Sequence, residues 1–352
     1  MKRIIKATYG FETDVIDVTQ KIINIINNGI DIKIMNNVFG NDPYHNKVKV
    51  LTIYFDDNTY HKVNENEYLN VKELKTIINI DNHLNNNLIN YSDKKVLILY
   101  VTHEINDNVI FFCKKGYINN NNYQYLFIIN DLNLKFNILP QSNNIRIINR
   151  ENIGLDFGGW TDGLFLKEND KFLYENYDYF IFINSTVKGP FFPLWYDDND
   201  WIKLFIKKIN NNIKLFGITI NISDGINYNP HVQSMFFVTD KLGLNILIKN
   251  KIFNKNNILT KKIRIVMEKE VAMSKIIINE GYNIGCFLYA YKNINFKYPI
   301  SNYNNIRITD HTISRNAYFG IEINPYEVIF IKTNKIPNSE IMAKYTEWHL
   351  TR

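Results

Sequence analysis

Two polar side chains in a glycine-rich stretch are the first residues of this sequence whose types and spacing suggest chemistry. The stretch, residues 152–160, reads NIGLDFGGW and contains the amide of Asn152 and the carboxylate of Asp156. It follows a short apolar run at 145–148 that has the composition of a buried strand. In α/β proteins, ligands bind outside the carboxyl ends of parallel strands. The stretch therefore indicates a ligand site, although glycines that only turn the chain give the same pattern.

Polar residues follow three more apolar runs in the same way. The runs occupy 96–101, 125–129 and 179–183. The residues after them are Thr102 with His103, Asn130 with Asp131, and Asn184 with Ser185 and Thr186. If the runs form neighbouring parallel strands, their carboxyl ends lie at one edge of the sheet, and the polar side chains meet there. Such an edge predicts a nucleotide site.

Several common nucleotide-binding and catalytic motifs are missing from the sequence. A dinucleotide fold would carry G-x-G-x-x-G after its first strand, where residues 102–105 read THEI without a glycine. The sequence has no P-loop, and it has no G-x-S-x-G elbow, which disfavours an α/β-hydrolase. A literal D-x-D at 198–200 lies in a loop beside Trp195 and Trp201. We interpret it as an exposed turn and helix cap rather than a metal site.

The elements that would position these residues alternate along the chain from residue 95 onward. Strands are predicted at the runs above and at 215–220 and 235–238, and helices at 109–117, 160–174, 240–252 and 261–280. This alternation is typical of an α/β fold with a Rossmann-like, mixed and mostly parallel sheet covered on both faces. Gly281 follows the last of these helices as a natural cap.

The first 78 residues have a different pattern and predict a small β-rich accessory domain. Short β-branched runs lie at 4–9, 30–35 and 48–55, and helical spacing lies at 18–27. Residues 79–94 are rich in Asn and are interpreted as a linker. The predicted organisation is therefore 1–78, a linker at 79–94, and a larger α/β domain at 95–352.

Composition excludes several classes of protein. The 352 residues are 45% hydrophobic, which suits a soluble globular protein of one large or two unequal domains. The net charge of +6 is mild and no Lys/Arg block is present, so we expect no nucleic-acid partner. Cys113 and Cys286 are the only cysteines, which implies neither a disulfide framework nor a zinc site. No signal peptide or transmembrane run is found, so a cytoplasmic protein is predicted.

The order of the strand-end motifs resembles a known family. Residues 95 to about 300 resemble a nucleotide-sugar-dependent glycosyltransferase of the A-type fold. The pattern N-x-G-x-D at 152–156, followed by NSTVKGPF at 184–191, is similar to rhamnan-synthesis-type and algal or giant-virus-like polysaccharide glycosyltransferases. Residues 231–237 and 324–333 resemble acceptor-side segments of that family. Residues 1–78 resemble a small β domain found on some DnaJ-type proteins, a likeness that implies no chemistry.

The resemblance implies a set of donor-binding residues. They are Thr102, His103, Asp131, Asn152, Gly154, Asp156, Asn184 and Ser185. Gly154 and Gly158 would let the backbone approach the donor closely. Asn184 stands where most A-type enzymes place a metal-binding carboxylate, and an amide is a poorer ligand for Mn or Mg. A requirement for Mn or Mg therefore stays open. His311 would reach a diphosphate or a metal, or would be a surface histidine.

The resemblance also implies catalytic and acceptor-side residues. An inverting enzyme needs one general base, and Glu270 is the first candidate, with Asp240 the second. Glu270 could equally be a solvated charge on a helix face. His231 and Gln233 would lie on the acceptor side, although His231 could also be a core histidine. Arg150 and Lys188 would offset diphosphate charge or be ordinary surface cations.

The resemblance implies a function in polysaccharide biosynthesis. The protein would move a hexosyl or deoxyhexosyl group, with inversion, from a nucleotide-sugar, expected to be a UDP-sugar, to a glycan or glycoprotein acceptor. The alternative is a catalytically inactive carbohydrate- or nucleotide-binding module, which Asn184 in place of a carboxylate favours. A third hypothesis is that residues 1–78 act as a protein-interaction domain.

Overall fold

The computed structural model divides the chain into two compact units, Met1–Ile89 and Asn90–Arg352. It describes residue 2 and residues 4–28, 31–40, 42–78, 91–196, 198–223, 228–256, 258–292, 294–297, 312–334 and 339–351. Each unit is described by itself. The predicted linker, 79–94, lies mainly outside the described residues, so the predicted domain boundaries stay a prediction.

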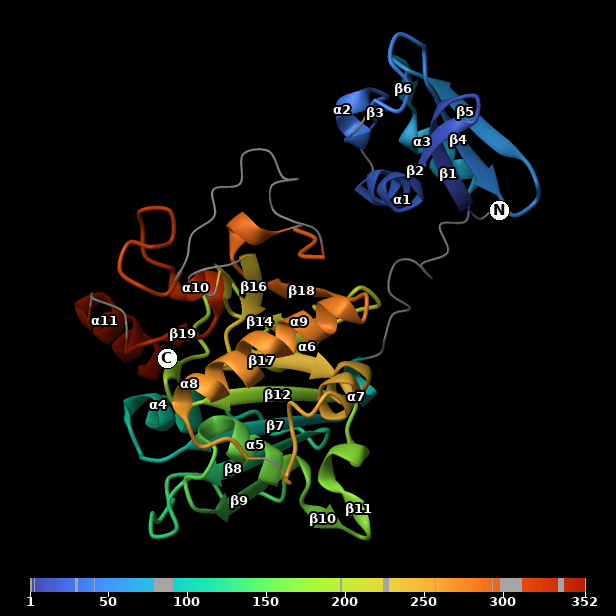
Figure 1. The fold of residues 1–352 in the computed structure, drawn as a ribbon. Helices are drawn as coiled ribbons and strands as arrows, with labels where there is room; N and C mark the ends of the chain where they lie inside the picture. The colour runs from blue at the N-terminus through green and yellow to red at the C-terminus, as the bar shows by residue number, and fades with distance from the viewer. Residues whose placement is uncertain are drawn as a thin grey trace. The chain divides into compact units, whose positions relative to one another are not determined.

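The first unit is built on a small antiparallel sheet, as the sequence predicted for a β-rich region (Figure 1). Its strand order is β2-β1-β4-β5, and β3 pairs separately with β6. The strands are β1 (Ile4–Phe11), β2 (Asp14–Asp17), β3 (Ile32–Lys33), β4 (Val50–Phe55), β5 (Tyr60–Asn64) and β6 (Tyr68–Leu69). The helices are α1 (Thr19–Asn28), α2 (Asn36–Phe39) and α3 (Val71–Ile77). The predicted strand at 30–35 is reduced to the two residues of β3. The DnaJ-type resemblance stays a prediction.

The second unit is built on a seven-stranded sheet with the order β18-β14-β17-β12-β7-β8-β9. Its strands are β7 (Val96–Thr102), β8 (Tyr123–Ile129), β9 (Ile145–Asn149), β12 (Tyr179–Asn184), β14 (Ile213–Gly217), β17 (Phe236–Asp240) and β18 (Asn283–Cys286). Every residue of β7 and β12 is buried, which matches their uninterrupted apolar sequences. The predicted α/β fold, preceded by a small β-rich region, is confirmed.

Strand direction decides which residues meet at each edge of this sheet. The strands β12, β7, β8 and β9 are parallel to one another, and β14 is parallel to β18. Strand β17 is antiparallel to both of its neighbours, β12 and β14. The sheet is thus mostly parallel, as predicted. Because β17 runs the other way, the residues that precede it lie at the same edge as the residues that follow β7, β8, β9 and β12.

Two tryptophans show how helices cover both faces of the sheet. Trp160 of α5 (Leu155–Leu164) packs edge-on against Phe182 and Phe237. Trp201 of α6 (Trp201–Ile206) packs against Phe236, whose side chain points to the opposite face from Phe237. Helices α5, α8 (Lys262–Ile265) and α9 (Ala272–Asn279) cross in front of the sheet in Figure 1.

Two predicted helices and one predicted strand are built differently from the expectation. The helix predicted at 160–174 begins earlier, at Leu155, and ends at Leu164. The remaining predicted residues lie mainly in β10 (Lys167–Glu168), β11 (Lys171–Phe172) and the 3₁₀ turn η2 (Leu173–Asn176). The helix predicted at 261–280 forms as α8 and α9 joined by a π-helical segment, η3 (Val266–Val271). The strand predicted at 215–220 is divided between β14 and β15.

Shorter elements complete the second unit. They are η1 (Tyr91–Asp93), α4 (Asp107–Lys115), β10 (Lys167–Glu168), β11 (Lys171–Phe172), η2 (Leu173–Asn176), β13 (Val187–Lys188), β15 (Ile220–Ser223), β16 (Tyr228–Val232), α7 (Lys241–Lys249), η4 (Tyr289–Tyr291), α10 (Pro325–Val328), β19 (Ile331–Lys332) and α11 (Ser339–Leu350). In the part of the chain that the structure describes, no helix combines the length and the apolar character that crossing a membrane requires.

Candidate functional site

A cleft opens at the edge of the sheet where the parallel strands end, and its volume is about 450 Å³. This volume is within the range of small-molecule sites in proteins, roughly 300–1,000 Å³. The residues that line it are His103, Asn130, Asn152, Leu155, Asp156, Phe157, Asn184, Ser185, Thr186, Ser234, Met235, Lys262, Ile265, Val266, Glu270, Lys332 and Asn334. The cleft therefore unites residues that follow β7, β8 and β12 with residues from the helical segment α8–η3 and from β19.

A chain of hydrogen bonds links the two polar stretches that the sequence singled out. The Asn184 amide donates from Nδ2 to Oδ2 of Asp156 at 2.8 Å. Its other atom, Oδ1, accepts hydrogen bonds from the backbone N–H of Thr186 at 3.0 Å and from the Thr186 hydroxyl at 2.6 Å. Asn184 is thus oriented so that its donor faces the carboxylate. The amide that departs from the family pattern holds Asp156 in place.

Helix α5 brings Asp156 to the cleft because the helix begins at the glycine-rich stretch. Gly154 caps its start with a φ of +80°, a conformation that L-residues rarely adopt. A Cβ on Gly158 would lie 2.0 Å from the carbonyl oxygen of Ile153, so this position has no room for a side chain. The two glycines allow the chain to pack against itself. Gly158 lies inside the helix. The close approach of the donor to these glycines stays a prediction.

Arg150 fixes the segment that leads into this helix. Its guanidinium contacts Asp162 of α5 at 2.6 Å, Oδ1 of Asn130 at 2.7 Å and the carbonyl oxygen of Ile153 at 2.7 Å. The Asn130 amide also donates to the carbonyl oxygen of Leu155 at 3.3 Å. Arg150 therefore connects the end of β8, the glycine-rich stretch and α5. These contacts give Arg150 a structural role.

Glu270 reaches the cleft from the π-helical segment η3. Its Oε2 accepts a hydrogen bond from the backbone N–H of Ser234 at 3.0 Å, and the Ser234 hydroxyl donates to the same oxygen. One turn further along, the Ser274 hydroxyl oxygen accepts from the backbone N–H of Val232 at 2.9 Å. The helix is thus fastened to the connection between β16 and β17. Single π-helical turns are frequent at functional sites because they re-aim side chains.

The electrostatics of the cleft centre on Asp156. Burial raises the pKa of the Asp156 carboxyl above its usual value, and the negative charge of Glu270 acts in the same direction. The hydrogen bond from Asn184 and the electrostatic influence of His103 and Lys332 act in the opposite direction and lower the pKa. The raised pKa means that burial outweighs these partners. The cleft therefore combines two carboxylates with nearby cationic side chains.

A divalent metal, which the A-type resemblance implies, needs several oxygen ligands. The Oδ1 atom of Asn184 already accepts two hydrogen bonds, and Oδ2 of Asp156 accepts one from Asn184. Within the described residues no group of three or more His, Cys, Asp and Glu side chains is placed to hold a metal ion. His311, the predicted metal ligand, lies outside the described residues. The described lining of the cleft therefore does not fit a metal held by the protein.

Six of the residues predicted from the sequence meet in the cleft. They are His103, Asn152, Asp156, Asn184, Ser185 and Glu270. Thr102 is buried, and its hydroxyl is engaged with the backbone of Glu104. Asp131 accepts a hydrogen bond from the backbone N–H of Asn133 at 2.7 Å, in the turn after β8. Gly154 caps the start of α5 and is not among the residues that line the cleft.

The two predicted acceptor-side residues are buried beside the cleft rather than in its lining. Nδ1 of His231 lies 2.8 Å from the carbonyl oxygen of Asn229, and Oε1 of Gln233 accepts a hydrogen bond from the Thr219 hydroxyl at 2.7 Å. These contacts lie within the pairing of β15 with β16 and its surroundings. The alternative interpretation of His231 as a core histidine agrees with its 4% exposure.

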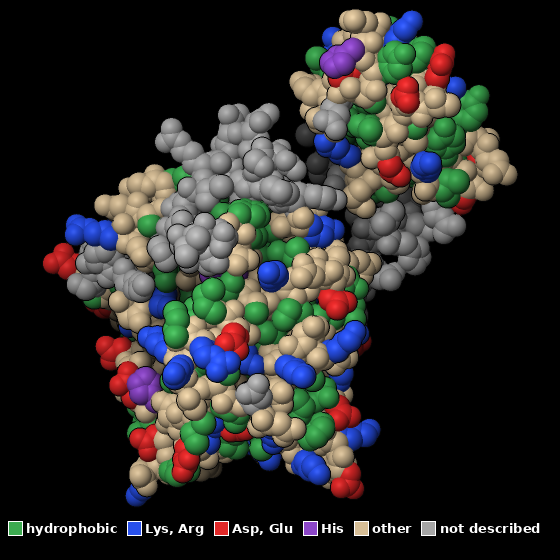
Figure 2. All heavy atoms as spheres, viewed as in Figure 1, with side chains coloured by type: hydrophobic (Ala, Val, Ile, Leu, Met, Phe, Trp, Pro, Cys, Tyr) green, Lys and Arg blue, Asp and Glu red, His purple; other side chains and the backbone are tan. Residues whose placement is uncertain are grey.

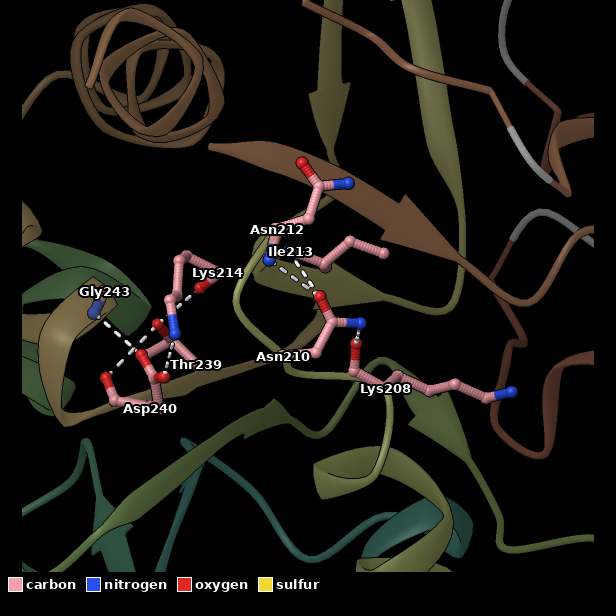
Figure 3. Close-up of polar contacts among 8 residues, drawn as sticks. All are labelled: Lys208, Asn210, Asn212, Ile213, Lys214, Thr239, Asp240 and Gly243. Atoms are coloured by element: carbon pink, nitrogen blue, oxygen red, sulfur yellow. Dashed lines mark hydrogen bonds and ion pairs between the residues drawn. The ribbon is translucent and has the colours of Figure 1, made fainter. Parts of the chain in front are cut away.

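The second candidate base, Asp240, lies at the opposite edge of the sheet. It ends β17, and its partner in the register is Tyr179, the first residue of β12. Its Oδ2 pairs with Nζ of Lys214 at 2.6 Å, and its Oδ1 accepts from the backbone N–H of Gly243 at 2.9 Å (Figure 3). Asp240 thus caps α7. The sequence did not show the direction of β17, and its antiparallel pairing with β12 places Asp240 at this edge.

The interpretation of the D-x-D at 198–200 as a turn and cap is confirmed. Asp200 caps α6 by accepting from the backbone N–H of Lys203 at 3.0 Å, and its Oδ2 accepts from the Tyr123 hydroxyl at 2.8 Å. Oδ1 of Asp198 accepts from the backbone N–H of Asp200.

Several cleft residues were not singled out individually from the sequence. They are Ser234, Lys262, Lys332 and Asn334. Ser234 precedes β17, and only the antiparallel direction of that strand brings it to this edge. Lys332 arrives through the pairing of β13 with β19, a contact between segments far apart in the sequence. Asn130 and Thr186, which the sequence did place at this edge, also line the cleft.

Comparison with known proteins gives one family match. Residues 137–314, just over half of the chain, match the family model described as rhamnan synthesis protein F. A crystal structure of a glycosyltransferase involved in the glycosylation of the major capsid of PBCV-1 is 11% identical, with 73% of this chain and 98% of that chain covered and a TM-score of 0.28. The apo structure of the bifunctional glycosyltransferase WbbM is 13% identical, with 55% of this chain and 39% of that chain covered, also at 0.28. No curated protein sequence matches significantly.

Proposed function

The chain belongs to the rhamnan synthesis protein F family, and from this premise we propose that it is a glycosyltransferase of the A-type fold that uses a nucleotide-sugar bound in the cleft. The observation that carries the proposal is the meeting of Asp156, Glu270 and Lys332 at the carboxyl edge of the parallel strands. Two carboxylates and a cation in one cleft of suitable size match the needs of a reaction that activates a hydroxyl and releases a diphosphate.

Glu270 is proposed as the general base. The bond between the anomeric carbon and the acceptor oxygen forms while the bond between that carbon and the diphosphate oxygen breaks. The acceptor proton passes to the Glu270 carboxylate, and the nucleoside diphosphate leaves. Ser234 supports this role because it holds one oxygen, Oε2, by its N–H and its hydroxyl, which fixes the carboxylate and leaves Oε1 as the oxygen proposed to take the proton.

Asp156 is proposed to position the donor. Its side chain lies at the first turn of α5, and the amino end of a helix favours negative groups, such as carboxylates and phosphates. Asn152, just before this helix, lines the same part of the cleft. We therefore propose that Asp156 accepts hydrogen bonds from donor hydroxyls, while the start of α5 faces the diphosphate.

The donor and acceptor are proposed by class. A UDP-sugar is the first donor to test, and the transferred group is proposed to be hexosyl or deoxyhexosyl. The acceptor is proposed to be a glycan or glycoprotein in polysaccharide biosynthesis. Inversion at the anomeric carbon is supported by the single carboxylate, Glu270, that Ser234 holds in place, since direct displacement needs one base.

A second candidate function is a nucleotide- or carbohydrate-binding module without catalysis. The observation that favours it is Asn184, which replaces the usual carboxylate and whose Oδ1 is taken up by Thr186. Such a module would bind a nucleoside diphosphate and show no turnover with any donor or acceptor.

The test is nucleotide release by the full chain with UDP-, GDP- and dTDP-sugars and simple glycan acceptors, with the product anomer assigned by NMR. The proposal predicts acceptor-dependent release with at least one donor and an inverted product. A retained product would overturn the proposed inversion. Binding without release would favour the non-catalytic module, and the absence of both binding and release would overturn the proposed function.

A further inference from the structure

Lys332 lies on β19, beyond the matched family segment, and is held at the cleft by contacts with residues inside that segment. It is the last residue of β19, and its partner in the antiparallel pairing with β13 is Val187. The next residue, Thr333, donates its backbone N–H to the carbonyl oxygen of Thr186 at 3.1 Å. The family match ends at residue 314, so it assigns no role to Lys332.

A buried side chain completes this support. Asn108, near the start of α4, is 7% exposed and donates from Nδ2 to the carbonyl oxygen of Ser185 and to the Thr333 hydroxyl, both at 2.9 Å. The backbone that follows Asn184 and the backbone that carries Lys332 are thereby tied to the same amide. The position of Lys332 relative to the end of β12 is built into the fold.

The charge of Lys332 acts inside the cleft. It is one of the groups that lower the pKa of Asp156 against the effect of burial. Lys262, the first residue of α8, lines the same cleft and is exposed. Figure 2 shows Lys and Arg side chains gathered on the face of this unit over the segment labelled α8 in Figure 1. Two lysines from separate elements thus border the cleft that contains Asp156 and Glu270.

We propose that Lys332, assisted by Lys262, offsets the charge of the donor diphosphate where most A-type enzymes use a divalent metal. This inference rests on the proposed function. The reason for assigning this role to lysines lies at the end of β12. Oδ1 of Asn184 already accepts two hydrogen bonds from Thr186, and the described lining of the cleft does not fit a metal. An ammonium group placed by the fold stabilises the negative charge that develops on the leaving diphosphate.

The test measures transfer and the binding of UDP, GDP and dTDP in EDTA for the wild type and for Lys332→Ala, Lys332→Arg and Lys262→Ala. Lys275→Ala, an exposed lysine of α9 outside the cleft, is the matched control. We expect wild-type transfer to survive EDTA and Lys332→Ala to lower kcat by about 100-fold or more, since removing one such electrostatic group typically costs about 10²–10³. Lys332→Arg should recover part of the rate, Lys262→Ala should cost less, and Lys275→Ala should match the wild type.

Unchanged transfer in folded Lys332→Ala would overturn the inference. So would wild-type transfer that EDTA abolishes and Mn²⁺ or Mg²⁺ restores. Thermal unfolding of each variant shows whether it is folded, and Lys332→Arg keeps the test decisive if the alanine variant is not. Both overturning outcomes leave the glycosyltransferase proposal standing. If the wild type neither binds a nucleoside diphosphate nor transfers a sugar under any condition, the proposed function fails and this inference fails with it.

Discussion

Asp156 and Asp240 both stand at a helix start beside the large sheet, yet they lie at opposite edges and have different surroundings. Asp240 has each carboxylate oxygen engaged, one by Lys214 and one by the start of α7 (Figure 3). Asp156 receives one hydrogen bond from Asn184 and lines an open cleft with Glu270. A carboxylate whose two oxygens are both engaged within the protein is part of the scaffold, whereas a carboxylate that borders open space is available to a ligand.

The direction of one strand creates this difference. Strand β17 is antiparallel to β12, so its first residues, with Ser234 before them, lie at the cleft, and its last residue, Asp240, lies at the far edge. If β17 were parallel to β12, Asp240 would lie at the cleft and Ser234 at the far edge. The predictions below test whether function and stability divide between the two edges as this geometry requires.

The largest effect is expected at the cleft edge for Glu270→Gln. The amide cannot take the acceptor proton, and a general base contributes about 10²–10⁴-fold to rate, so kcat should fall by about 100-fold or more. Thermal unfolding should stay close to that of the wild type. Glu280→Gln, an exposed position at the end of the same helical segment, is the control. Equal activity in the two variants would remove Glu270 from the mechanism.

At the opposite edge of the sheet, a substitution should lower the stability of the protein rather than its activity. Asp240→Ala removes an ion pair in which the Lys214 side chain is 8% exposed, and it also removes the cap of α7. Breaking such a pair and a cap should lower the free energy of unfolding by about 2–4 kcal/mol, as urea denaturation would show. Activity per folded molecule should be unchanged. A lower kcat without a loss of stability would contradict the division between the edges.

Ser234→Ala should give a smaller loss at the cleft. It removes the hydroxyl that holds Glu270 but leaves the backbone hydrogen bond, so we expect kcat to fall about tenfold, close to the lower end of the range for a bond to a charged group. As a positioning residue, Ser234 should affect kcat more than KM, and Ser234→Thr should restore part of the rate. A change confined to KM would instead place Ser234 in substrate binding.

The smallest effect is expected in the pH dependence of stability. The folded protein raises the pKa of Asp156, so between the usual carboxyl pKa of about 3.9 and the higher folded value the folded state binds more protons than the unfolded state. Wild-type stability should therefore fall, relative to Asp156→Asn, as the pH rises through this window. Urea midpoints of both proteins from about pH 4 to 7 would show it. Wild-type stability that stays constant or rises relative to Asp156→Asn across this pH range would contradict the raised pKa.

The sequence predicts the strand ends well because buried parallel strands are uninterrupted apolar runs, and the polar residues after them stand out. His103, Asn152 and Asn184 were found in this way. Other features depend on tertiary contacts that no local pattern contains. Asp240 was predicted as a candidate base, but it lies at the opposite edge because β17 is antiparallel to β12. Similarly, only the pairing of β19 with β13 brings Lys332 to the cleft. The glycines after Ile153 predicted a loop because helix interiors disfavour glycine, but close packing requires Gly158 there.

The most direct test is a crystal structure of the full chain with a nucleoside diphosphate soaked in, beginning with UDP. The account predicts that the diphosphate lies in the cleft at the start of α5, within hydrogen-bonding distance of Lys332, with Glu270 left facing the acceptor side. A nucleotide bound elsewhere, for example beside Lys214 and Asp240 at the opposite edge, would contradict it.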